Sequence, residues 1–163
     1  MYCSSITVLA LFAASVAGKM CINQTVPVNI SARQAVFDIA VPQSNLEVTD
    51  FVLNITQQGR NFTDIALKGY STTSGTYNIS TQFCIPDASN ITNPTVQVLT
   101  HGIGFDKTYW DLPYNDYNYS YLNVATDKYK YCTSSFDRLG IGNSSHGEPL
   151  NEIQAFLEIA ATA

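Results

Sequence analysis

The chain has 163 residues, the length of about one domain. Its net charge is −5, and only 13% of its residues are charged, against roughly 25% in an average globular protein. Hydrophobic residues make up 45% of the chain, which excludes a disordered polyelectrolyte. The acidic balance also argues against a nucleic-acid partner, because such proteins carry a basic stripe.

The amino-terminal segment has the pattern of a secretory signal peptide. Its apolar run, Ile6 to Ala17, is too short to span a bilayer, and Ser15-Val16-Ala17 offers small residues to a signal peptidase. We therefore expect residues 1–17 to be removed. Residues 18–163 would then be secreted and extracellular, with no attachment to a membrane. An N-terminal membrane anchor is the alternative.

The first half of the mature chain is predicted to be rich in strands. Apolar residues alternate from Ala35 to Val41, and Phe51–Thr56 and Thr76–Phe83 predict two more strands. In these two strands Asn54 and Asn78 lie opposite the apolar side chains, and so would face solvent.

The chain contains eight Asn-x-Ser/Thr sequons, which favour an exported glycoprotein. Together with 13 Asn, 14 Ser and 16 Thr, glycans would supply the solubility that charge does not. The predicted glycosylation sites are Asn23, Asn29, Asn54, Asn61, Asn78, Asn90, Asn118 and Asn143.

The mature chain keeps three cysteines, because Cys3 lies in the predicted signal peptide. Secretion permits disulfides, and we expect Cys21 to pair with Cys84, at the end of a strand. Cys132 would then be free and buried. The sequence alone does not establish this pairing.

The second half of the chain is predicted to alternate strands with helices. Val96–Leu99 is short and apolar, as a strand buried on both faces would be, and Tyr131–Phe136 predicts another strand. Pro149 is expected to open a helix. Its apolar residues recur at helical spacing and would face a sheet. They are Ile153, Phe156, Leu157 and Ala160.

Two glycine-containing loops follow the two strands of this second half. His101-Gly102-Ile103-Gly104-Phe105-Asp106 resembles the oxyanion loop of α/β-hydrolases, and Asp137-Arg138-Leu139-Gly140-Ile141-Gly142-Asn143-Ser144 resembles the D-x-x-G-x-G-x-S turn after the fourth strand of that fold. The two motifs occur in the family's order. About 35 residues separate them, which suits a crossover between parallel strands.

The longer stretches His101–Trp110, Asp137–Ser145 and Asn151–Gln154 resemble secreted α/β-hydrolases of filamentous fungi. The resemblance implies a partial α/β-hydrolase fold, in which a β-rich N-terminal half is followed by βα units. Full-length relatives would use a serine nucleophile, as esterases and lipases do, on small-molecule or lipid esters.

The resemblance also implies roles for individual residues. The backbone N–H of Ile103 would stabilise the oxyanion of acyl transfer, and losing one such donor costs roughly 100- to 1000-fold in rate. His101, Gly102 and Gly104 would shape this loop. The structural turn would contain Asp137, Gly140 and Gly142. A plain glycine turn after a strand is the alternative for the first loop.

An aromatic segment begins directly after the first loop. Seven tyrosines lie between Tyr109 and Tyr131, and with Phe105 and Trp110 they predict a pocket wall for an apolar or aromatic acyl group. A core and cap layer beneath a loop is the alternative. The acidic charge disfavours stacking on nucleic-acid bases.

The chain contains no Gly-x-Ser-x-Gly nucleophile elbow, which a hydrolase of this fold requires. The two nearest matches, Gly69–Thr73 and Gly142–His146, fail at their last position. In the family the elbow would lie beyond Ala163, followed by the acid and the histidine. We therefore expect no catalytic residue, cofactor or metal site in this chain, which would be an inactive N-terminal half.

The hydrolase interpretation also predicts self-association. A missing fifth strand would leave the edge of Val96–Leu99 open, and an open edge invites pairing with another chain.

The alternative function is that of a complete, non-catalytic secreted glycoprotein that binds a ligand through its tyrosine-rich segment.

Overall fold

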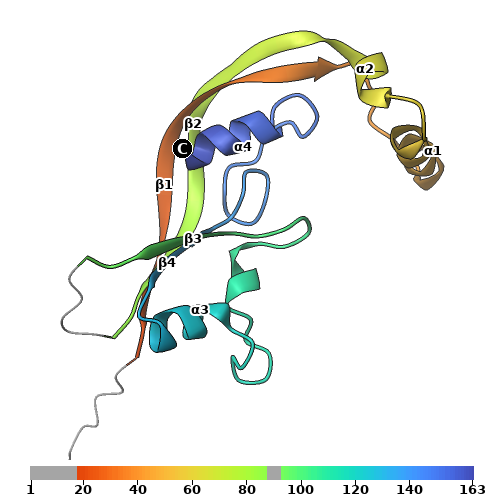
Figure 1. Ribbon diagram of the computed structural model, residues 1–163. Coiled ribbons are helices and arrows are strands. Elements are labelled where there is room, and N and C mark those ends of the chain that lie inside the picture. Colours follow the sequence, from red (N-terminus) through yellow and green to blue (C-terminus); the bar gives the residue numbers. More distant parts are fainter. Residues whose placement is uncertain (1–17, 88–92) are drawn as a thin grey trace, which may run out of the picture.

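A computed structural model describes residues 18–87 and 93–163. Its frame is a mixed four-stranded sheet in the order β1-β2-β4-β3 (Figure 1). Pairing is antiparallel between β1 and β2 and between β2 and β4, whereas β3 and β4 are parallel. With its helices, the chain is therefore a mixed α/β structure, as predicted at this coarse level. The strands are β1 (Met20–Phe37), β2 (Leu67–Ile85), β3 (Val96–Thr100) and β4 (Cys132–Phe136). The predicted signal peptide and Asn90 lie outside the described residues.

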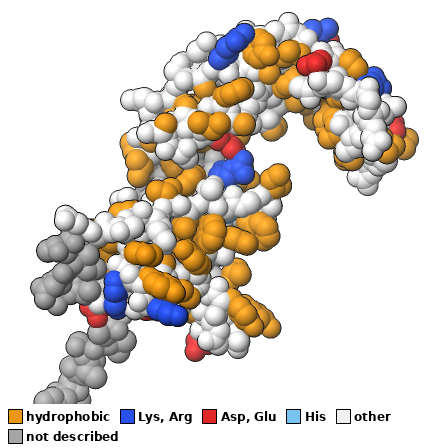
Figure 2. Space-filling view, in the orientation of Figure 1, with side chains coloured by type: hydrophobic (Ala, Val, Ile, Leu, Met, Phe, Trp, Pro, Cys, Tyr) orange, Lys and Arg blue, Asp and Glu red, His pale blue; other side chains and the backbone are white. Residues whose placement is uncertain are grey.

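The two longest strands form a curved arm. β1 and β2 pair from Met20–Ile85 at the base to Phe37–Leu67 near the tip, where α1 (Asn45–Thr56) and α2 (Phe62–Ala66) connect them (Figure 1). Apolar side chains lie on the surface around α1, which has no fully buried residue (Figure 2). The strand predicted for residues 35–41 ends at Phe37. The ladder is irregular at Val36 and Phe37, so the prediction for residues 38–41 was wrong.

The predicted strand Phe51–Thr56 is also wrong, because these residues form the last part of α1. Ser44 caps the helix by accepting a hydrogen bond from the N–H of Glu47 at 3.3 Å, and the Glu47 carboxylate accepts one from the N–H of Gln43 at 2.7 Å. The pair is a variant of the capping box, in which the Glu47 carboxylate bonds the N–H one residue before the cap, and it fixes the helical start. Asn54 therefore has no strand face, and its side chain donates to the carbonyl of Asp50.

The predicted strand Thr76–Phe83 is correct, and Asn78 faces solvent as expected. Thr76–Phe83 lies inside β2, and Asn78 is exposed between the buried side chains of Tyr77 and Ile79. Successive side chains of a strand alternate between the two faces, which explains this placement.

One face of the sheet is covered by α4 (Ala155–Thr162), which packs on β1 (Figure 1). The core here consists of Ile30, Tyr77, Ile79, Leu139 and Leu157, and Ile153 and Ala160 pack against it. Phe156, predicted to face the sheet, is exposed instead.

The helix predicted from Pro149 begins at Ala155, so the predicted start was wrong. The Gln154 side chain accepts from the N–H of Ala35 at 2.9 Å and donates to its carbonyl at 2.8 Å, as a neighbouring strand would. This pairing anchors Gln154 beside β1. Gln154 is the N-cap residue of α4 and has extended backbone, so the helix begins at the next residue.

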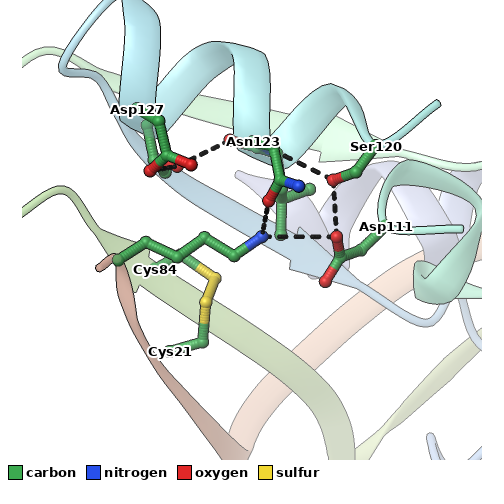
Figure 3. The surroundings of a disulfide bond; sticks show 9 residues. Cys21, Cys84, Asp111, Ser120, Asn123 and Asp127 are labelled. Atoms are coloured by element: carbon green, nitrogen blue, oxygen red, sulfur yellow. Dashed lines mark hydrogen bonds and ion pairs between the residues drawn. A yellow bond between two sulfur atoms is a disulfide. The ribbon is translucent and has the colours of Figure 1, made fainter. Parts of the chain in front are cut away.

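The opposite face carries the predicted disulfide, Cys21–Cys84, which joins β1 to β2 at the base of the arm. Figure 3 shows it beside Asp111, Ser120 and Asn123. The Asp111 carboxylate accepts hydrogen bonds from Ser120 at 2.5 Å and from Lys19 at 3.3 Å. Cys132 is buried on β4 and forms no disulfide with another described residue.

The connection from β3 to β4 is a crossover of short helical turns. It contains η1 (Lys107–Trp110), α3 (Tyr121–Asn123) and η2 (Val124–Lys128). Because β3 has only β4 as a neighbour among the described strands, it is an edge strand. Val96 and Val98 are exposed and Leu99 is buried, so the prediction of burial on both faces was wrong.

Candidate functional site

Two loops meet at the carboxyl ends of the parallel strands β3 and β4. His101 follows β3 and is buried, and its Nε2 accepts a hydrogen bond from the backbone N–H of Arg138, after β4, at 3.1 Å. Its Nδ1 lies 2.9 Å from the carbonyl oxygen of Gly102. An accepting Nε2 requires the proton on Nδ1, which then donates to Gly102. His101 therefore connects the two loops and shapes the first one.

The tip of the first loop is open to solvent. Ile103 is 93% exposed, and Gly104 has φ +81°, a left-handed conformation that favours glycine. The turn is closed by the N–H of Phe105, which donates to the carbonyl of Gly102 at 3.4 Å. Within the described chain, the N–H groups of Ile103 and Gly104 take part in no hydrogen bond. Both donors are thus available to a ligand.

The second loop is built around the carboxylate of Asp137, whose side chain is only 1% exposed. Its Oδ1 accepts from the N–H of Lys107 at 2.9 Å, and its Oδ2 accepts from Lys107 Nζ at 2.7 Å and from the N–H of Asn143 at 3.2 Å. Lys107 Nζ also donates to Ser80 Oγ on β2 at 2.9 Å. The Lys107–Asp137 ion pair therefore joins both loops to the sheet.

This environment acts on the pKa of Asp137 in opposite directions. Burial alone would raise the pKa, but the hydrogen bonds from Lys107 and Asn143 and the charge of Lys107 outweigh it, so the pKa lies below its ordinary value. The carboxylate is consequently ionised at neutral pH and fully hydrogen-bonded.

Close packing explains the glycine at position 142. It has φ +55°, and a Cβ atom there would lie 2.5 Å from Asp137 Oδ2. Gly140 is also left-handed, at φ +78°, and its N–H donates to the carbonyl of Ser145. The two glycines let the backbone wrap around the carboxylate.

Ser144 serves the same turn through its hydroxyl group. Its Oγ accepts from the N–H of Ser80 at 2.9 Å and donates to the carbonyl of Asp137 at 2.6 Å. The hydroxyl is buried and paired on both sides, so it is a structural group here. His146, two residues further on, is exposed.

A groove of about 430 Å³ lies between the two loops. Phe105 and Tyr109 line it, with their ring centroids 4.8 Å apart. Trp110 does not line it. Its ring packs instead against the core cluster of Cys84, Leu99 and Leu122, and makes an edge contact with Tyr109 at 5.1 Å. Figure 2 shows apolar side chains gathered over this part of the molecule.

Sequence reasoning did not assign a role to Lys107. The available signal was Asp137, which directly follows a strand and is therefore expected to be buried. A buried carboxylate requires a charged or hydrogen-bonding partner. Lys107, which directly follows the first motif, was a candidate for that partner. Arg138 likewise extends from the turn to α4, where its Nε donates to Glu158 at 3.0 Å.

Two classes of site have no support in the part of the chain that is described. Residues 18–87 and 93–163 contain no group of three or more His, Cys, Asp or Glu side chains placed to hold a metal ion. In these same ranges no helix has both the length and the apolar character needed to cross a membrane.

Comparisons with known proteins add no identification. No family model matches the chain, and no curated protein resembles it significantly. Functional inference therefore rests on the residues and their geometry.

Proposed function

We propose that this chain is the N-terminal part of a secreted α/β-hydrolase of the serine esterase or lipase type. The meeting of the two loops at the carboxyl ends of β3 and β4 carries this proposal, because ligands of open α/β sheets bind at that edge. The substrate would be a small-molecule or lipid ester. The nucleophile, acid and base would belong to residues outside these 163.

Within this proposal the first loop supplies half of the oxyanion hole. The free N–H of Ile103 would donate to the developing oxyanion, while His101 and the Lys107–Asp137 pair hold the loop in place. A donor held rigidly before the reaction needs no reorganisation as charge develops, which is why its positioning matters.

The open edge of β3 supports a larger fold. In the resembling family a fifth strand pairs with the strand that carries the oxyanion loop. Among the described strands β3 pairs with β4 alone, so the other edge of its backbone is free to pair with a further strand. Expressed alone, the chain should self-associate through this edge. A monodisperse monomer in analytical ultracentrifugation would contradict the incomplete fold.

Export is a separate part of the proposal. A disulfide persists in an oxidising compartment, so Cys21–Cys84 supports secretion. Six predicted glycosylation asparagines are exposed, which leaves room for glycans. They are Asn23, Asn29, Asn61, Asn78, Asn118 and Asn143. Mass spectrometry of the secreted protein before and after glycosidase treatment tests both points.

The coding sequence downstream of Ala163 provides the decisive test. We expect a continuing frame with Gly-x-Ser-x-Gly within roughly 50 residues, the scale of one further βα unit. The 163-residue chain itself should neither hydrolyse p-nitrophenyl esters nor react with a fluorophosphonate. Labelling at one of its serines would overturn the proposal.

The oxyanion role of Ile103 is testable in the extended protein with a matched pair of variants. Ile103→Pro removes the N–H and should lower kcat roughly 100- to 1000-fold. Ile103→Ala keeps the N–H and loses only an exposed side chain, so kcat should change little. Equal losses in both variants would reject the role.

The ligand-binding alternative has one observation in its favour. Tyr114, Tyr117, Tyr119 and Tyr129 are exposed, and exposed aromatic rings mark binding surfaces. A stop codon directly after Ala163 with no elbow downstream would favour this non-catalytic glycoprotein.

A further inference from the structure

The groove between the two loops has the properties of a preformed binding site. On one side are Phe105, Tyr109 and Leu112, and the turn after β4 contributes Ile141 and Gly142. Its volume of about 430 Å³ falls within the range of small-molecule sites. The three apolar side chains of the first side remain 40–52% exposed, so they are available to a ligand.

The groove walls are fixed before any ligand binds. Asp106 caps η1 by accepting from the N–H of Thr108 at 2.8 Å and from its hydroxyl at 2.6 Å, which orients the turn that carries Tyr109. The Lys107–Asp137 pair holds the same turn against the second loop. A preorganised site saves the ordering cost of binding.

Ring geometry favours an aromatic ligand. The rings of Phe105 and Tyr109 both line the groove, lie 4.8 Å apart and are tilted by 53° to one another. Both remain partly exposed, so an aromatic ring could pack against them. Aromatic pairs in tilted or edge arrangements gain more than their buried area provides.

Charge at the groove disfavours an anionic ligand. The Asp106 carboxylate lines the groove, and the hydrogen bonds from Thr108 hold its pKa below the ordinary value. Lys107 and Asp137 compensate one another, which leaves Asp106 as a local negative charge that repels an anion.

We propose that the groove lined by Phe105, Tyr109 and Leu112 binds a neutral aromatic group of the ester substrate, beside the free N–H of Ile103. This inference rests on the proposed hydrolase function, because only then is the bound ester a substrate. Binding itself requires no nucleophile and can be measured separately. It narrows the substrate class from esters in general to aromatic esters.

The test compares ligands on the 163-residue chain. Trp110 is the single tryptophan and touches Tyr109, so its fluorescence reports binding in the groove. Ethyl benzoate should bind about 3- to 10-fold more tightly than ethyl cyclohexanecarboxylate, its saturated counterpart. Sodium benzoate should bind more weakly than ethyl benzoate. Equal affinity for the two esters would overturn the aromatic assignment.

Variants then locate the bound ester, with saturation-transfer NMR on the ester protons as a second readout. Leu112→Ala and Tyr109→Ala should each weaken ethyl benzoate binding by about tenfold or more, whereas Tyr114→Ala should leave it within twofold. Tyr114 is exposed, stacks on Tyr119 and does not line the groove. Circular dichroism and thermal melts confirm that the variants fold. Unchanged binding in the folded Leu112 and Tyr109 variants would overturn the site.

The two proposals fail in different ways. If ethyl benzoate binds as expected but the downstream sequence lacks an elbow, the groove stands and the hydrolase proposal falls. If an elbow is present but no ester prefers the groove, only the aromatic assignment falls.

Discussion

The tip of the β1–β2 arm and the loops after β3 and β4 are held together in different ways. Each region contains an ion pair: Asp38–Lys68 in the arm has side chains that are 70% and 61% exposed, whereas Asp137–Lys107 has 1% and 14%. The arm depends on its backbone ladder, and α1 buries no side chain completely. The loops depend on buried polar groups with defined partners. Single substitutions should therefore damage the loops far more than the arm.

The sharpest comparison removes one carboxylate from each ion pair. Asp137→Ala leaves Lys107 buried without its partner, and breaking a buried pair costs about 3–5 kcal/mol. Asp38→Ala should cost less than about 1 kcal/mol, because water screens the exposed pair. Urea denaturation of both variants measures the difference. Equal losses of unfolding free energy in the two variants would mean that the buried ion pair stabilises the chain no more than the exposed one.

Removing the disulfide tests how much the covalent link at the base stabilises the β1–β2 arm. The double variant Cys21→Ala, Cys84→Ala should lose about 2–4 kcal/mol of unfolding free energy, since the bridge closes a long loop. The exchange of backbone amide hydrogens should accelerate more along β1 and β2 than along β4. A loss of protection confined to β3 and β4 would contradict this expectation.

Two left-handed glycines provide a matched pair for the same comparison. Gly59, near the tip, has open space around a Cβ atom, so Gly59→Ala should cost only the conformational penalty of about 1–2 kcal/mol. Gly142→Ala adds a clash with Asp137 and should cost roughly 3 kcal/mol. Thermal and urea unfolding check both values, and a larger loss at Gly59 would reverse the interpretation.

Acid should act on the loops through Asp137. Because its pKa is lower in the folded chain than the ordinary 3.8, the carboxylate stabilises the fold above that value. This stabilisation is lost as the pH falls below about 4 and through the folded pKa. The difference in unfolding free energy between the original chain and Asp137→Asn should therefore shrink over that interval. A difference independent of pH would rule out this titration.

The smallest effect is expected at the tip. Leu46 on α1 is 72% exposed, so Leu46→Ala should change the unfolding free energy by less than about 0.5 kcal/mol. Leu157→Ala, in the buried face of α4, should cost about 2–5 kcal/mol. Urea denaturation tests both; a marked loss at Leu46 would show that α1 is packed in solution.

The sequence predicted the parts of the fold that rest on local pattern. The strands predicted at Thr76–Phe83 and Tyr131–Phe136 correspond to the inner part of β2 and to β4. Cys21 and Cys84, far apart in sequence, also pair as expected.

The strand predicted at residues 51–56 failed because six residues are too few to separate the two periods. Val48, Phe51, Val52 and Ile55 recur at i, i+3, i+4 and i+7, which is the spacing of a helix face. The capping box at Ser44 and Glu47 was the signal that distinguishes them.

Other features depend on partners far apart in the chain. The residue that precedes α4, Gln154, is anchored by pairing with Ala35, which no local pattern reveals. The exposure of Val98 depends on which elements cover that face of β3. At the candidate site, the two loops were predicted by motif, but Lys107 required knowing that Asp137 would be buried beside it.

The position of the disulfide has a mechanical consequence. Cys21 and Cys84 are 63 residues apart in sequence and lie near the base of the arm, so tension applied to the two ends of the chain passes through the sulfur bridge. Once α4 and Gln154 have been pulled away from β1, the arm between the two cysteines carries no load and keeps its hydrogen bonds. After reduction the same tension would open the β1–β2 ladder from its base, one residue pair at a time.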